Sequence, residues 1–141
     1  REMFREALKR FDMGLEDRMA TKIGLLSGGQ RQVVTLLMST IVTPKLLLLD
    51  EHTAALDPAT AEKVMAITND IVRERNLTTL MITHNMGQAL TTGSRTIMLD
   101  SGAIIFDIKE EEREHMTVSD LLDMYSEKKK EEFDNDRILL S

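Results

Sequence analysis

The fold is decided by the stretch Leu26-Ser27-Gly28-Gly29-Gln30-Arg31-Gln32, followed a short distance along the chain by Leu46-Leu47-Leu48-Leu49-Asp50-Glu51. A Ser-Gly-Gly turn that opens a helix presents backbone N–H groups to an anion, because the first N–H groups of a helix have no partner inside it. An aliphatic strand that ends in two adjacent carboxylates presents oxygen ligands to a hard metal ion and to a water molecule. Together the two segments predict a site for a phosphate and a divalent cation.

Each segment taken alone also has a purely structural explanation. A serine caps many helices, and two glycines permit a tight turn. An aliphatic run followed by Asp-Glu is also what a strand looks like where it meets solvent. The functional interpretation therefore depends on finding both segments in this order and at this spacing.

The rest of the chain alternates between helical and extended patterns. Periodicity predicts helices at residues 4–11, 33–42, 58–76 and 85–91, a final helix from 118, and strands at 46–49, 78–83, 96–99 and 103–106. Asp57-Pro58 is a strong helix start, and Asp100-Ser101-Gly102 predicts a hairpin turn. Thr117 with Asp120 three residues later resembles a capping box.

Strands that alternate with helices favour an α/β fold built on a mainly parallel sheet. Ligands of such sheets bind at the carboxyl ends of the strands. Asp50-Glu51 and His84 follow two of the predicted strands, so we expect them to lie at that edge.

Composition describes a single globular domain and argues against a chain that spans a membrane by itself and against a nucleic-acid-binding protein. The chain has 141 residues, of which 42% are apolar and 30% charged, and it has no cysteine and no apolar run long enough to cross a bilayer. Residues 1–106 carry 12 acidic and 12 basic side chains, whereas residues 107–141 carry 12 acidic and 6 basic. An acidic tail repels phosphate backbones, so we expect no nucleic-acid partner.

The segment Leu26–Gln32 resembles the signature sequence of the ATP-binding-cassette (ABC) ATPases, and Leu46–Glu51 resembles the Walker B motif of that family. The resemblance implies a partial P-loop NTPase fold that lacks the N-terminal half with the Walker A loop. It divides the chain into the end of a helical subdomain with the signature helix (1–43), an α/β core with a hairpin (44–106) and an acidic helical segment (107–141).

The resemblance implies a role for each residue of the two motifs. Ser27 would donate its hydroxyl, and Gly28 and Gly29 their N–H groups, to the γ-phosphate of an ATP held by the opposite subunit, with Gln30 close by. Asp50 would orient Mg²⁺, usually through water. Glu51 would polarise the water that attacks the γ-phosphate.

Two further segments match the family's pattern. Ala54-Ala55-Leu56-Asp57 resembles the D-loop, which places Asp57 at the interface between subunits and is compatible with Asp57 as a helix cap. His84 matches the switch histidine that contacts the γ-phosphate. A lone histidine after a strand also has a structural explanation, and the position of His84 relative to Asp50-Glu51 is what favours the functional one.

His52 departs from the family's pattern, which most often has proline after the catalytic glutamate. One hypothesis is that a protonated His52 lowers the pKa of Glu51 and weakens it as a base at mildly acid pH. The alternative is a tolerated substitution in a loop.

The chain contains no Gly-x-x-x-x-Gly-Lys-Ser/Thr loop. We therefore expect part of a longer protein, inactive as an ATPase in isolation.

The resemblance implies an ATP- and Mg²⁺-dependent subunit that dimerises head to tail and works with a transmembrane permease and a solute-binding protein at the inner face of the membrane. The stretch Glu51-His52-Thr53-Ala54-Ala55-Leu56-Asp57 also resembles a subgroup of bacterial uptake systems for tryptophan, tyrosine or similar solutes. The alternatives are a soluble ABC-type ATPase acting on nucleic acid or ribosomes, and a nonenzymatic interaction fragment.

Overall fold

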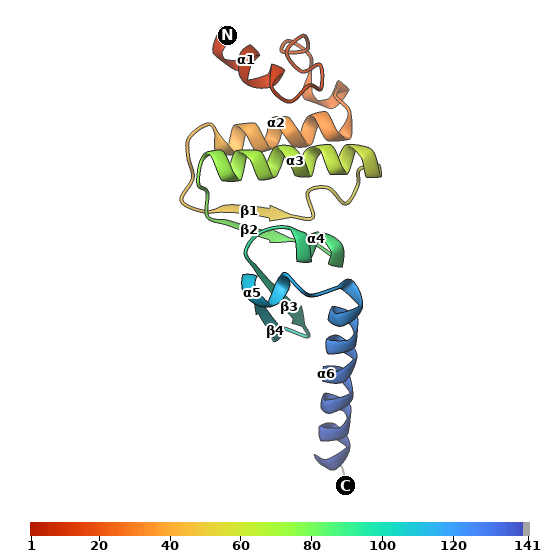
Figure 1. Cartoon of the computed structure of the whole chain (residues 1–141). Helices are drawn as coiled ribbons and strands as arrows, with labels where there is room; N and C mark the ends of the chain where they lie inside the picture. Colours follow the sequence, from red (N-terminus) through yellow and green to blue (C-terminus); the bar gives the residue numbers. More distant parts are fainter. Residues whose placement is uncertain (140–141) are drawn as a thin grey trace. The chain divides into compact units, whose positions relative to one another are not determined.

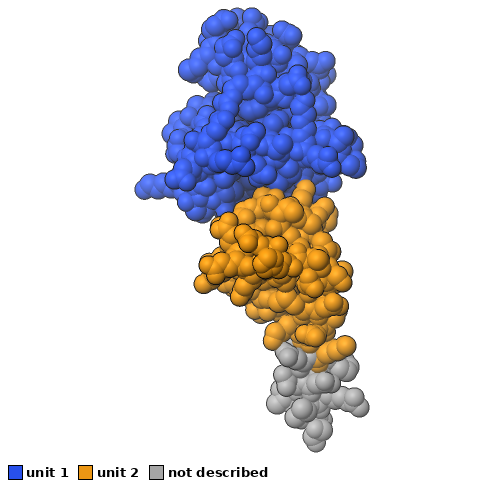
Figure 2. Space-filling model, viewed as in Figure 1, with its two compact units in different colours: residues 1–82 blue, residues 83–141 orange. Residues whose placement is uncertain are grey.

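The computed structural model describes the backbone of residues 1–139 and the side chains of residues 1–130. It divides into two compact units, Arg1–Ile82 and Thr83–Ser141, coloured separately in Figure 2.

The first unit contains four helices and a two-stranded parallel sheet. Its elements are α1 (Glu2–Lys9), the 3₁₀ helix η1 (Ile23–Leu25), α2 (Gly28–Thr40), β1 (Leu47–Asp50), α3 (Pro58–Glu74) and β2 (Thr79–Ile82). Strands β1 and β2 pair in register, with Asp50 opposite Ile82. Figure 1 shows α2 and α3 side by side, on the same side of this sheet.

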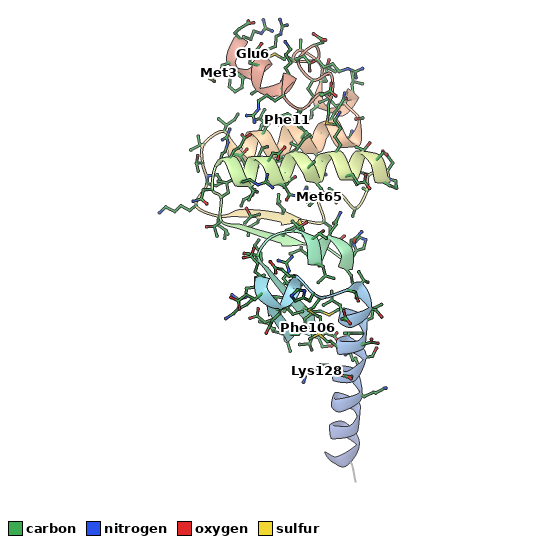
Figure 3. The ribbon with its side chains drawn as sticks, in the orientation of Figure 1. Met3, Glu6, Phe11, Met65, Phe106 and Lys128 are labelled. Atoms are coloured by element: carbon green, nitrogen blue, oxygen red, sulfur yellow. The ribbon has the colours of Figure 1, made fainter. Side chains whose placement is uncertain are left out.

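The core of the first unit lies between the two long helices and one face of the sheet. Val33 of α2 and Val64 of α3 are fully buried, and Leu47 and Leu49 of β1 join the same cluster. Phe11 lies between α1 and α2 (Figure 3). Because side chains alternate along a strand, the intervening Leu48 is exposed on the opposite face.

The second unit is built around an antiparallel hairpin. Its elements are α4 (Met86–Thr91), β3 (Arg95–Asp100), β4 (Ala103–Lys109), α5 (Glu110–Arg113) and α6 (Val118–Leu139). Ser101 and Gly102 have φ angles of +50° and +82°, which suits a hairpin turn with two left-handed residues. Across the hairpin, the Arg95 guanidinium donates to both carboxylate oxygens of Asp107 at 2.7 and 2.5 Å.

Arg113 is the polar centre of the second unit. Its side chain is buried, and its guanidinium donates to the carbonyl oxygens of Ala89, Leu90, Thr92 and Gly93 at 2.5–3.1 Å. These carbonyls lie at the end of α4, where helical carbonyls lack partners and a positive charge is favourable. The short helix α5 that carries Arg113 was not predicted from the sequence pattern.

The mixed α/β class and the hairpin are confirmed, but the mainly parallel sheet is wrong for the described residues. They form two separate two-stranded sheets, one parallel and one antiparallel. The expected helix at 33–42 begins earlier, at Gly28, because Ser27 caps it and brings both glycines into the first turn. The Thr117–Asp120 capping box is confirmed by hydrogen bonds in both directions.

Candidate functional site

Ser27 begins the first half of the candidate site as the N-cap of α2. Its Oγ accepts a hydrogen bond from Gln30 N at 3.3 Å, and Gln30 Oε1 accepts one from Ser27 N at 3.0 Å, which completes a capping box. Accepting a bond does not use the O–H proton of Ser27, so the hydroxyl can still donate to an anion. The N–H groups of Gly28 and Gly29 belong to the first turn, where a helix offers donors to an anion.

The side-chain amide of Gln30 makes its hydrogen bonds within the protein. Besides its part in the capping box, its Nε2 donates to Met13 O at 2.9 Å. The side chain therefore ties the start of α2 to the preceding loop. These contacts hold Gln30 beside the Ser27-Gly28-Gly29 turn.

The two glycines pack differently against the start of α3. A Cβ added at Gly29 would lie 2.3 Å from Thr60 Cγ2, and one added at Gly28 would lie 3.0 Å from Leu56 Cδ2. Gly29 is buried, so the α2–α3 contact itself requires a residue without a side chain there. The structure thus brings the glycine turn against the loop that ends at Asp57.

Asp50 and Glu51 form the second half of the site, at the carboxyl end of β1. Both residues are exposed, directly beyond the buried Leu49. Glu51 N donates to Ile82 O at 3.0 Å, which continues the pairing with β2 by one residue. Glu51 then adopts a φ of +42°, a left-handed conformation that is unfavourable for a residue other than glycine.

The residues after Glu51 form a tight loop. Ala54 N donates to Glu51 O at 3.0 Å, and Leu56 N donates to Thr53 O at 3.1 Å. Asp57 closes the loop as N-cap of α3, accepting from Thr60 N at 3.1 Å. Hydrogen bonds from Thr60 hold the pKa of Asp57 below its ordinary value.

His52 is half-buried in this loop and contacts α3. Its Nε2 lies 3.1 Å from Thr68 Oγ1. Burial lowers the pKa of His52, which disfavours the protonated form that the pKa-tuning hypothesis requires. The position is therefore better described by its contact with Thr68 than by a charge beside Glu51. Thr68 was expected on the inward face of α3, but nothing in the sequence marked its hydroxyl as a partner of His52.

His84 belongs to the second unit and is exposed. The backbone around it is held by Thr83 Oγ1, which accepts from Asn85 N at 3.1 Å and donates to Gln88 Oε1 at 3.0 Å. Asn85 caps α4 by accepting from Gln88 N at 3.0 Å. This network fixes the chain on both sides of His84.

Metal binding at this site would rely on few protein ligands. Among the described residues, no three His, Cys, Asp or Glu side chains lie together in a way that could hold a metal ion. Asp50 and Glu51 nevertheless have the chemistry that Mg²⁺ favours, since it is commonly bound through one or two carboxylates, with water and phosphate oxygens completing its octahedron. The donor set therefore fits a cation that arrives with a nucleotide.

Comparison with known proteins identifies the family. The family model described as ABC transporter matches residues 1–54. The chain is 48% identical to a tyrosine transport ATP-binding protein of Clostridioides difficile (strain R20291), over 84% of this chain and 47% of that protein. The chain belongs to the ABC transporter ATP-binding proteins.

Other members of the ABC family show the same relationship. A thiamine import ATP-binding protein of Salmonella paratyphi A (strain ATCC 9150 / SARB42) is 41% identical over 77% of this chain and 46% of its own length. A solved ABC transporter described as of the metal-chelate type, in an inward-facing conformation, matches with a TM-score of 0.68 and 26% identity, over 86% of this chain and 47% of that chain.

The chain spans about half the length of the curated ABC relatives that it matches. The predicted resemblance to the family is confirmed, and membership of a family of ATP-binding proteins implies ATP as the nucleotide. Within the part of the chain that the structure describes, no helix is both long and apolar enough to cross a membrane.

Proposed function

We propose that this chain supplies the signature and Walker B half of an ATP-hydrolysing subunit of an ABC importer. The proposal is carried by two features that lie against each other. One is the start of α2, which is capped by Ser27 and whose first N–H groups suit a phosphate. The other is the loop that follows Asp50 and Glu51, a carboxylate pair at the end of the parallel strand β1. The remaining part of the fold would be a P-loop NTPase half with the Walker A loop, and residues 1–43, 44–106 and 107–141 would form the three segments expected from the sequence.

In the proposed site, each half acts on a different nucleotide. Ser27, Gly28 and Gly29 bind the γ-phosphate of an ATP held by a second, head-to-tail subunit, with Gln30 supporting the turn, and Asp57 lies at the interface between subunits. Asp50 orients Mg²⁺, which supplies charge neutralisation on the phosphates when bound. Glu51 accepts a proton from the attacking water, and His84 contacts the γ-phosphate.

The names of the relatives support a role in uptake of small solutes. The relative at 48% identity transports tyrosine by its name, so we propose an aromatic amino acid or a similar solute as the cargo. The proposed partners are a transmembrane permease, which would hold the subunit at the inner face of the membrane, and a solute-binding protein.

The test is magnesium-dependent ATP hydrolysis by an ABC subunit that contains this chain together with a phosphate-binding loop. Glu51→Gln should slow turnover about 10²–10⁴-fold, because the water loses its general base. Glu62→Gln is the matched control, since Glu62 is an exposed carboxylate on α3 outside the site, and it should leave turnover unchanged. The isolated chain should hydrolyse ATP hardly at all. Turnover by the isolated chain, or full activity of Glu51→Gln in the complete subunit, would refute the proposal.

A further inference from the structure

The bond between His52 and Thr68 joins the loop after β1 to the middle of α3. Thr68 is 2% exposed, and its hydroxyl donates to Val64 O at 2.8 Å. A threonine hydroxyl has one proton, so toward His52 the same oxygen can only accept. In this arrangement Nε2 of His52 is the donor, and a neutral His52 ring then carries its proton on Nε2 with Nδ1 unprotonated.

This bond acts next to the one strained residue of the candidate site. Glu51 has a φ of +42°, a conformation that is unfavourable for a residue with a side chain and persists only where the surroundings hold it. On its N-terminal side, Glu51 is held by the bond from its N–H to Ile82 O. On its C-terminal side, the next residue is His52, whose ring is tied to Thr68.

We propose that His52 is a positioning residue which, through its Nε2–H bond to Thr68, keeps Glu51 in its left-handed conformation and so sets the direction of the Glu51 carboxylate. An anchor on each side of Glu51, together with the bond from Ala54 N to Glu51 O inside the loop, restricts the φ and ψ of Glu51 more than any one of these contacts alone. Without the His52 anchor the loop can relax, and Glu51 returns to a negative φ that points its side chain elsewhere. The proposal rests on the proposed function only for the consequence in catalysis.

The first test reads the backbone directly, in the complete subunit that contains this chain. Nitrogen NMR of the His52 ring should show the Nε2–H tautomer, and Thr68→Val should remove that preference. In His52→Ala and in Thr68→Val, chemical shifts and scalar couplings of Glu51 should report a change of φ from positive to negative. A positive φ that persists in both variants would overturn the proposal, whether or not the protein hydrolyses ATP.

The second test reads the consequence for hydrolysis. His52→Ala and Thr68→Val should lower kcat about 3–10-fold, the range of one hydrogen bond, while KM for ATP changes little. His52→Gln, which keeps an N–H donor at a similar reach, and Thr68→Ser, which keeps the hydroxyl, should recover most of kcat. Equal kcat in all four variants and the wild type would overturn the positioning role.

Thr40→Val separates positioning from general destabilisation. Thr40 is a buried helical threonine whose hydroxyl also donates to the carbonyl four residues earlier, Leu36 O at 2.8 Å, but it lies on α2, and the hydrogen-bond partner of His52 is Thr68. It should lose stability as Thr68→Val does and keep its kcat. Loss of kcat in Thr40→Val equal to that in Thr68→Val would count against the proposal. If the wild-type subunit shows no hydrolysis sensitive to Glu51→Gln, the proposed function fails, and the NMR test still decides the role of His52.

Discussion

Replacing Gly29 by alanine should destabilise the first unit although alanine is the better helix former. The new Cβ would lie 2.3 Å from Thr60 Cγ2, well inside the 3.4 Å at which ordinary van der Waals contact begins, and 3.3 Å from Met13 Cε. Met13 Cε is the flexible end of a side chain and can move, but Thr60 is β-branched and lies in the first turn of α3, so its Cγ2 can yield only if the side chain leaves its rotamer or the two helices separate.

The expected magnitude is the difference between two opposing effects. Overpacking of a well-packed contact costs about 1–3 kcal/mol, while alanine in place of glycine within a helix gains about 0.5–1 kcal/mol by restricting the unfolded chain. The net loss should be about 1–2 kcal/mol in the free energy of unfolding. It is measured by urea denaturation of a purified protein that contains this chain, with the slope m checked for constancy.

A double-mutant cycle identifies the cause. Thr60→Ser deletes Cγ2 and leaves the bond from Thr60 N to Asp57 in place, so the Gly29→Ala change should cost less in that background by about 1 kcal/mol. Gly24→Ala is the matched control, because a Cβ there meets no atom within 4 Å. A Gly29→Ala protein as stable as the wild type, or the same cost with serine and threonine at position 60, would refute the packing argument.

Two further predictions concern the second unit. Arg113→Met removes the donors to the carbonyls at the end of α4 and should lower the stability of the second unit by about 2–3 kcal/mol, seen as faster hydrogen exchange of the α4 amides. Arg113→Lys should recover only part of this stability, because lysine lacks the planar fork of the guanidinium. Unchanged exchange in Arg113→Met would contradict this prediction. Hydrogen bonds from the N–H and hydroxyl of Thr117 hold the pKa of Asp120 below its ordinary value. The contribution of this cap to the stability of α6 is therefore fully present above the ordinary carboxyl pKa, and it is lost as the pH falls through the lowered pKa. A carbon NMR titration of the Asp120 carboxyl tests this, and a titration at the ordinary value would exclude the effect.

Features that depend on neighbours within a few residues were predicted well from the sequence. The Asp57-Pro58 helix start, the hairpin at Asp100-Ser101-Gly102 and the capping box of Thr117 were all expected and all found. Their physics is local, because a cap or a turn needs only the backbone of the next two or three residues. The family was also identifiable from two short segments.

Features that join distant parts of the chain could not be predicted. A sheet expected to be mainly parallel is two small sheets in the described residues, because strand pairing depends on which strands meet and not on the pattern within each. Nothing in the sequence pattern distinguished Arg113 from the other basic residues of its acidic segment, yet its side chain is buried against the end of α4.

The sequence by itself determined that a capped glycine turn precedes a strand ending in Asp50-Glu51, since both motifs are continuous in the chain. Only the tertiary structure decided that Gly29 must be small for α3 to approach, and that His52 reaches Thr68 beside a strained Glu51. Such contacts arise from the packing of two elements against each other, and packing distances of a few ångströms are not encoded in the spacing of residues along either one.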